Sequence, residues 1–95
     1  MSHAYVWEFV VPAEARERFE RDYGPQGPWA RLFRRAEGYI ETILLRDRGT
    51  PGRYLTVDRW ESRDAYRRFR ERFTQEYDEI DRQCEALTER ETPLG

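Results

Sequence analysis

The stretch RYLTVDRWESRDAYRRF, residues 53–69, decides the fold because it changes from strand-like to helical composition within three residues. Arg53 to Trp60 is rich in β-branched and aromatic side chains over the length of one strand. Ser62 is a good N-cap, and Asp64 falls in the first turn, where the helix dipole favours a negative charge. The stretch predicts a strand that runs into a long helix, whose apolar stripe continues to Cys84.

The segments on either side predict two further strands and another helical region, because turn residues separate runs of strand or helix periodicity. The expected elements are a strand over residues 4–11, a helix from Pro12 that is broken at 24–27, a short helix from Pro28 that Gly38 ends, a strand over 39–46, a turn at 47–52, the strand and helix above, and a final strand within 87–92. This order, β-α-β-β-α-β, with right-handed crossovers gives one antiparallel sheet with its helices on a single face. The sequence therefore predicts one α+β domain of the ferredoxin-like kind over residues 1–95.

Composition excludes several classes of partner. The 17 basic residues against 19 acidic ones give a net charge of −2, which disfavours nucleic acids and anionic membranes. No apolar run approaches the roughly 20 residues of a membrane span. The first residues, MSHAYVWEF, lack the basic start of a signal peptide, and the lone Cys84 cannot form an intrachain disulfide. We therefore expect a cytoplasmic protein that binds neither nucleic acid nor membrane.

The strands carry more apolar surface than helices on one side of a sheet can cover. Tyr5, Trp7 and Phe9 alternate with two valines, and residues 39–46 are apolar on both faces. A monomer would leave one of these faces in water as a contiguous apolar patch. We expect a homodimer that pairs through the sheet face. The alternative is that arginine side chains and the C-terminal segment cover the patch.

Several stretches in this order resemble the antibiotic biosynthesis monooxygenase (ABM) domain family. The junction LTVDRWES at residues 55–62, followed by Ala65-Tyr66 and Phe69, is similar to the W-x-S junction between strand and helix in that family. The opening VWEF at residues 6–9, the helical Phe19 and AEGY at residues 36–39 are also similar. The resemblance implies a ferredoxin-like fold that dimerises through its sheets, the dimeric α/β-barrel arrangement.

The resemblance leaves the reaction open, because some members oxygenate anthrone- or quinol-like aromatics without metal or flavin and others degrade haem. The haem degraders use an Asn on the first strand, a Trp on the third and a His on the second helix. Trp60 matches the Trp, but Glu8 stands where the Asn would be, and the only histidine is His3. The resemblance therefore argues against haem degradation by that arrangement.

Glu8 and Asp58 are the candidate catalytic residues. Each carboxylate lies within a mainly apolar strand, where desolvation would raise its pKa and let it act as a base near neutral pH. In an oxygenase without a cofactor, such a base would deprotonate a phenol or enol, and the resulting anion would pass an electron to O₂. The alternative for both residues is an ion pair, with Arg59 for example, or an edge position in water.

An aromatic set is expected to line a flat cleft between helices and sheet, where a planar molecule would be held by burial and stacking. Its members are Trp29, Phe33, Trp60, Tyr66, Phe69 and Phe73. Tyr66 could hydrogen-bond a carbonyl, and Trp29 follows a Gly/Pro break that could form the rim. For Phe69 and Phe73, core packing is the simpler interpretation.

These features lead to one functional hypothesis and one rival. The hypothesis is a homodimeric monooxygenase that acts on a small aromatic or polyketide-type compound and needs no cofactor. No metal site is expected, since one His and one Cys lie far apart without an acidic cluster. The rival is a non-catalytic module of the same fold that binds a small ligand or serves an accessory role, with both carboxylates structural.

Overall fold

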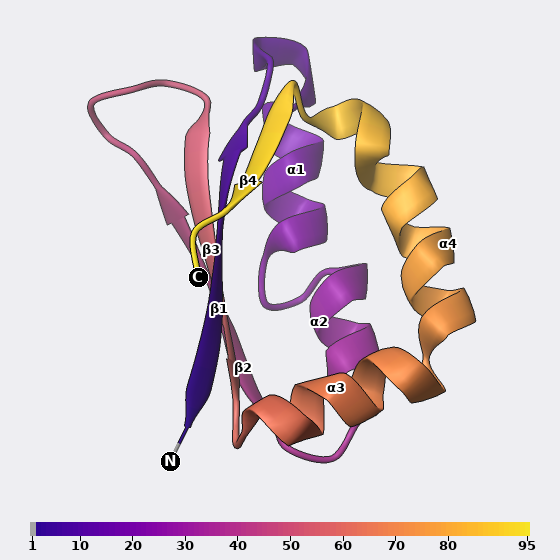
Figure 1. The fold of residues 1–95 in the computed structure, drawn as a ribbon. Coiled ribbons are helices and arrows are strands. Elements are labelled where there is room, and N and C mark those ends of the chain that lie inside the picture. The colour runs from indigo at the N-terminus through magenta and orange to yellow at the C-terminus, as the bar shows by residue number, and fades with distance from the viewer. Residues whose placement is uncertain (1) are drawn as a thin grey trace.

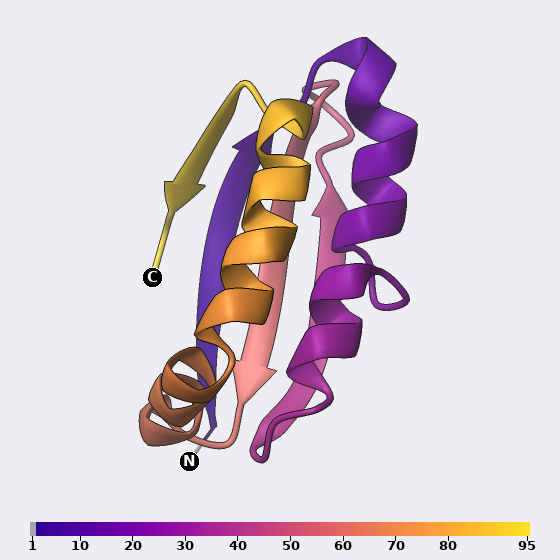
Figure 2. The same cartoon turned by 90° about the vertical axis from the view of Figure 1, so that its right-hand side faces the viewer.

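A four-stranded antiparallel sheet forms one side of the molecule, in the order β2-β3-β1-β4 (Figure 1). In the computed structural model, which describes residues 2–95, its strands are β1 His3–Val10, β2 Tyr39–Arg46, β3 Arg53–Trp60 and β4 Arg90–Pro93. All helices pack on the same face of this sheet, as Figure 2 shows from the helix side. The α+β ferredoxin-like fold predicted from the sequence is therefore confirmed.

The helical layer contains more breaks than the sequence predicts. Its elements are the 3₁₀ turn η1 Ala13–Ala15, α1 Arg16–Tyr23, α2 Pro28–Phe33, α3 Arg63–Arg72, α4 Thr74–Cys84 and the 3₁₀ turn η2 Glu85–Leu87. The expected single helix from Ser62 to Cys84 is wrong, because the chain turns at Phe73, where φ is −110° and ψ is 30°. As a result α3 runs along one end of the sheet, whereas α4 runs beside its strands (Figure 1).

Local chemistry explains where α3 begins. Ser62 Oγ accepts a hydrogen bond of 3.0 Å from the amide of Ala65, as expected for an N-cap. Gly38, just before β2, has φ of 91°, and a β-carbon at this position would lie 2.5 Å from that of Ala65. Glycine is therefore required twice over at this position, for its backbone conformation and for the close approach of α3.

One irregularity changes the faces of β2. Tyr39 is opposite Trp60 and Glu41 is opposite Arg59, so Ile40 is an extra residue in the ladder. Regular alternation from Tyr39 would put its side chain on the face opposite Thr42. The bulge corrects this expectation, since both side chains lie on the helix side of the sheet, joined by a hydrogen bond of 2.7 Å.

Two aromatic clusters form the core between sheet and helices. The larger one is centred on Trp60, which is completely buried and packs against Phe33 and Phe69. The smaller one joins Phe9 and Phe19 to Tyr54. These clusters fix the two ends of the sheet against the helices.

The other face of the sheet bears no helix (Figure 1). Its apolar side chains, which alternate with those that face the helices, are Val6, Val10, Ile43, Leu45, Leu55 and Val57. We call these six residues the open face. Ile43 is 37% exposed and Leu45 is 46% exposed, so the chain by itself leaves a row of aliphatic side chains in water.

Candidate active site

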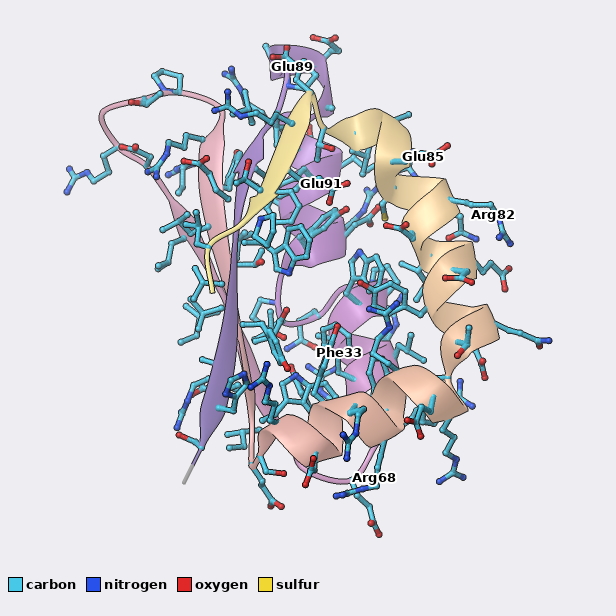
Figure 3. All side chains as sticks on the ribbon, in the orientation of Figure 1. Phe33, Arg68, Arg82, Glu85, Glu89 and Glu91 are labelled. Carbon is cyan, nitrogen blue, oxygen red and sulfur yellow. The ribbon has the colours of Figure 1, made fainter. Side chains whose placement is uncertain are left out.

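A cavity of about 490 Å³ lies between the sheet and the helices. Every strand and the helices α1 to α4 contribute to its wall. Its lining residues are Tyr5, Trp7, Phe9, Tyr23, Trp29, Phe33, Thr42, Thr56, Asp58, Tyr66, Arg70, Tyr77, Asp81 and Glu91. Eight of these fourteen are aromatic, so the cavity suits a flat, mainly apolar molecule. Figure 3 shows side chains converging on this region, with Phe33 and Glu91 among those labelled.

Asp58 is the polar centre of the wall formed by the sheet. It extends from β3 toward the helices, and burial raises its pKa from 3.8 to about 6. Thr42 Oγ1, on the neighbouring strand β2, donates a hydrogen bond of 2.7 Å to Asp58 Oδ1, which opposes that rise. Arg59, the arginine expected as its partner, pairs with Glu41 instead. Within residues 2–95, Asp58 makes no ion pair, and it keeps the pKa of a base that works near neutral pH.

The aromatic side of the cavity comes largely from the helices. Trp29 of α2 lies edge-on to Tyr77 of α4, with ring centroids 4.9 Å apart, and it also contacts Tyr23 and Phe33. Desolvation raises the pKa of the Tyr23 and Tyr77 phenols, so both hydroxyls stay protonated and can donate hydrogen bonds. The helices thus provide both flat contact surface and neutral donors.

Charged groups lie where α3, α4 and β4 reach the cavity. Arg70 stacks over the ring of Tyr77 at 3.8 Å and donates a hydrogen bond of 3.3 Å to the Tyr66 hydroxyl. Asp81 and Glu91 stand at the exposed rim, and partial burial together with Asp81 raises the pKa of Glu91. The polar rim therefore contains one cation, already engaged with two tyrosines, and two carboxylates.

The structure brings together four of the residues expected at the site. Asp58, Trp29, Phe33 and Tyr66 all line the cavity. Trp60, Phe69 and Phe73 belong instead to the core behind it and are at most 5% exposed. For Phe69 and Phe73 this agrees with the simpler interpretation, core packing.

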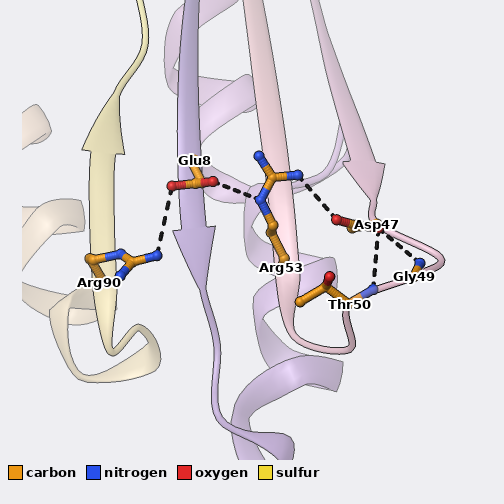
Figure 4. Close-up of polar contacts among 6 residues, drawn as sticks. All are labelled: Glu8, Asp47, Gly49, Thr50, Arg53 and Arg90. Carbon is orange, nitrogen blue, oxygen red and sulfur yellow. Dashed lines mark hydrogen bonds and ion pairs between the residues drawn. The ribbon is translucent and has the colours of Figure 1, made fainter.

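Glu8 lies away from the cavity. Its neighbours along β1, Trp7 and Phe9, line the cavity, so alternation turns Glu8 to the open face. There its Oε2 accepts a hydrogen bond of 2.6 Å from Arg53 Nε, and its Oε1 lies 3.9 Å from Arg90 (Figure 4). Arg53 also binds Asp47, which accepts hydrogen bonds from two amides of the hairpin turn. Glu8 thus joins β1, β3, β4 and the turn in one ion-pair network.

Several lining residues lie outside the expected set. Tyr5 and Trp7 follow from the alternation of β1 once the face is known, and Thr42 and Thr56 follow likewise on β2 and β3. Glu91 comes from the short final strand, whose pairing with Phe9 no sequence signal indicates. The sequence does not show which face of each strand meets the helices, and this information was needed to identify these residues.

Two further features, a metal site and a membrane-spanning helix, are absent from residues 2–95. There, the His, Cys, Asp and Glu side chains form no group of three or more that could hold a metal ion. None of the helices in this range has the length and apolar character needed to cross a membrane.

Comparison with known proteins shows which family and which solved structures the chain is similar to. The sequence profile described as antibiotic biosynthesis monooxygenase matches residues 3–75. Among solved structures, a cofactor-independent oxygenase of Streptomyces nogalater, SnoaB, is similar with 25% identity and a TM-score of 0.62 over 99% of this chain and 91% of its own. No curated protein matches the chain.

Two other solved structures share the fold at lower identity. A candidate monooxygenase of Nitrosomonas europaea has 13% identity and a TM-score of 0.71, over 98% of this chain and 86% of its own. A candidate monooxygenase of Fusobacterium nucleatum has 14% identity and a TM-score of 0.70 over 97% of this chain. The present chain spans only 40% of the length of the Fusobacterium protein.

Proposed function

The chain belongs to the antibiotic biosynthesis monooxygenase family, and we propose that it oxygenates a small aromatic or polyketide-type compound without a cofactor. The observation that carries this proposal is the position of Asp58. A carboxylate with a pKa of about 6 opens into a cavity walled by aromatic rings and is neutralised by no arginine. The similarity to SnoaB, a cofactor-independent oxygenase, supports the same class of reaction.

The proposed reaction draws its electrons from the substrate. Asp58 takes a proton from a phenol or an enolisable ring position, which leaves an electron-rich anion in the cavity. The anion passes one electron to O₂, and the resulting radical and superoxide combine to form a C–O bond. For a ring methylene, cleavage of the O–O bond then leaves a carbonyl on the ring and releases one molecule of water. The substrate loses two hydrogens and gains one oxygen, so the atoms and electrons balance.

Other lining residues have roles that follow from their positions. Trp29, Phe33 and Tyr77 provide the surface against which a flat ligand would stack. Tyr66 presents a hydroxyl to the cavity beside Arg70, and it could donate a hydrogen bond to a ring carbonyl that becomes more negative after deprotonation. Thr42 holds the Asp58 carboxylate in place.

Oxygen uptake with anthrone as substrate tests this proposal. The wild-type protein should consume one O₂ for each anthrone oxidised, and Asp58→Asn should abolish most of the acceleration over buffer. If neither protein accelerates uptake while anthrone still binds, the chain is a ligand-binding module. The aromatic cavity would serve that second function as well.

A second copy of the chain is the proposed cover of the open face. Its six aliphatic residues come from β1, β2 and β3, and the Glu8–Arg53 and Glu41–Arg59 pairs lie among them on the same face. Each pair is internally neutral, so two such faces can approach without excess charge of one sign. Burial of a row of this kind between two sheets stabilises association by the hydrophobic effect.

A further inference from the structure

A chain of three oxygen atoms leads from Asp58 to the outside of the cavity. Thr42 Oγ1 donates a 2.7 Å hydrogen bond to Asp58 Oδ1, and the Tyr39 hydroxyl lies 2.7 Å from the same Thr42 oxygen. Asp58 and Thr42 line the cavity, whereas Tyr39 does not line it and is partly exposed. The three groups thus form a hydrogen-bonded line from a carboxylate that lines the cavity to a partly exposed side chain that does not.

The bulge at Ile40 creates this chain. Residues three apart on a regular strand point to opposite faces, so Tyr39 and Thr42 could not meet. The extra residue turns Tyr39 to the helix side, where its ring packs on Phe33 and Trp60 with centroids 5.6 and 5.4 Å away. Packing holds the phenol in place, and bulges that re-aim side chains are common beside active sites.

We propose that Thr42 and Tyr39 form a proton relay that exchanges the Asp58 proton with solvent while a ligand fills the cavity. The inference rests on the proposed function, because it needs Asp58 to take a proton from the ligand. Thr42 and Tyr39 act through Asp58 and do not react with the ligand. Burial raises the pKa of Tyr39, so its hydroxyl remains protonated at neutral pH, as a relay requires.

Each transfer in the relay balances. The Asp58 carboxylate accepts the ligand's proton and becomes a neutral carboxyl, while the ligand becomes an anion. Once the carboxyl is neutral, the two hydroxyls turn so that Thr42 donates to the Tyr39 oxygen and Tyr39 donates to water. The carboxyl then passes a proton to Thr42 Oγ1, as Thr42 passes its own to the Tyr39 oxygen and Tyr39 releases its own to water. The carboxylate is restored, both hydroxyls keep one hydrogen each, and one proton has moved from ligand to solvent. The reverse sequence returns a proton from solvent to the ligand.

A relay is useful here because the walls around Asp58 are aromatic. A flat ligand stacked against Trp7, Trp29 and Phe33 would cover the carboxylate and separate it from water on the cavity side. Without another route, the proton on Asp58 could return only to the ligand it came from. The alternative is that Thr42 only satisfies the carboxylate and holds it in place. In that case Thr42→Val would still change Asp58 itself, whereas Tyr39→Phe, which leaves the Thr42–Asp58 hydrogen bond intact, would exchange like the wild type.

Anaerobic deuterium exchange into anthrone separates these two roles. In D₂O without oxygen, deuterium enters the ring methylene only if the abstracted proton is replaced by one from solvent before it returns. We expect the wild-type protein to accelerate exchange over buffer, and Thr42→Val to slow that exchange by about ten-fold or more. Thr42→Ser should restore it, and Tyr39→Phe should slow it in the same direction.

Tyr54→Phe is the matched control, since it removes a hydroxyl that hydrogen-bonds to Glu20 outside the cavity, and it should exchange like wild type. The relay is overturned if Thr42→Val exchanges as fast as wild type while it binds anthrone with equal affinity. If the wild type produces no exchange while it still consumes oxygen with anthrone, the relay fails alone. If it does neither, the proposed function of Asp58 fails as well. If the wild type consumes oxygen with anthrone and Thr42→Val has no effect on exchange, the relay is contradicted and the proposed function is not.

Discussion

Glu8 and Asp58 lie on neighbouring strands of one sheet, yet their side chains point to opposite faces of it. Asp58 lines the cavity, whereas Glu8 pairs with Arg53 on the open face. We therefore expect Asp58→Asn to lower turnover of anthrone by roughly 10²- to 10⁴-fold and Glu8→Gln to change it by less than about two-fold. Steady-state oxygen uptake measures both. A large loss in Glu8→Gln with an intact Asp58 response would contradict this assignment.

The pKa of Asp58 predicts the pH dependence of the reaction. A general base must be deprotonated, so kcat/KM should rise about ten-fold per pH unit below pH 6 and level off above it. The inflection should lie near the Asp58 pKa of about 6 and should be absent in Asp58→Asn. A profile that is flat from pH 5 to 7 in the wild type would show that another group is the base.

The same raised pKa should make Asp58 a cost to stability at neutral pH. Between its ordinary value of 3.8 and about 6, the unfolded chain has lost this proton and the folded chain retains it. The folded state therefore loses stability through this group as pH rises across that window, by about 1–3 kcal/mol in total.

Because an asparagine does not ionise, Asp58→Asn should match the wild type near pH 4 and be more stable near pH 7. Urea unfolding of both proteins at the two pH values measures the difference in their free energies of unfolding. The contributions of the other titrating groups cancel in this difference, because both proteins share them. A variant that is less stable than wild type at pH 7 would contradict the desolvation argument.

The open face predicts assembly in solution. The wild type should sediment as a dimer at micromolar concentration, and Ile43→Glu should sediment as a monomer, because it places a charge among aliphatic side chains. Ile43 is 37% exposed in the single chain, so the substitution should leave the fold intact by circular dichroism. Gln75→Glu adds the same charge on the exposed side of α4 and serves as the control. A wild type that stays monomeric would contradict the proposed dimer.

The sheet could be predicted closely from the sequence because its signals are local. Strands 39–46 and 53–60 are bounded by Gly38, by the turn at 47–52 and by the Ser62 cap, and the structure has the same bounds. The break at Phe73 could not be predicted in this way. Phe73 fits the apolar stripe of a continuous helix and is buried in the structure, so periodicity alone gives no sign of the turn.

The site could be predicted only in part, because periodicity assigns residues to two faces without saying which face meets the helices. By that criterion Glu8 and Asp58 were equivalent, since both are carboxylates in apolar strands. Asp58 faces the helices and Glu8 does not, and this difference depends on which alternate residues of β1 and β3 point toward the helices in the packed molecule. The hydrogen bond between Tyr39 and Thr42 depends in addition on the bulge at Ile40, which strict alternation does not predict.

Anaerobic absorbance titration of anthrone isolates proton abstraction by Asp58, because it observes this step without the oxygen chemistry that follows. The enolate of anthrone absorbs at longer wavelength than the neutral ketone. At pH 7.5 and with anthrone bound to saturation, the wild-type protein should produce more of this enolate band than Asp58→Asn. An equal band in both proteins at equal occupancy would contradict the role of Asp58 as the base.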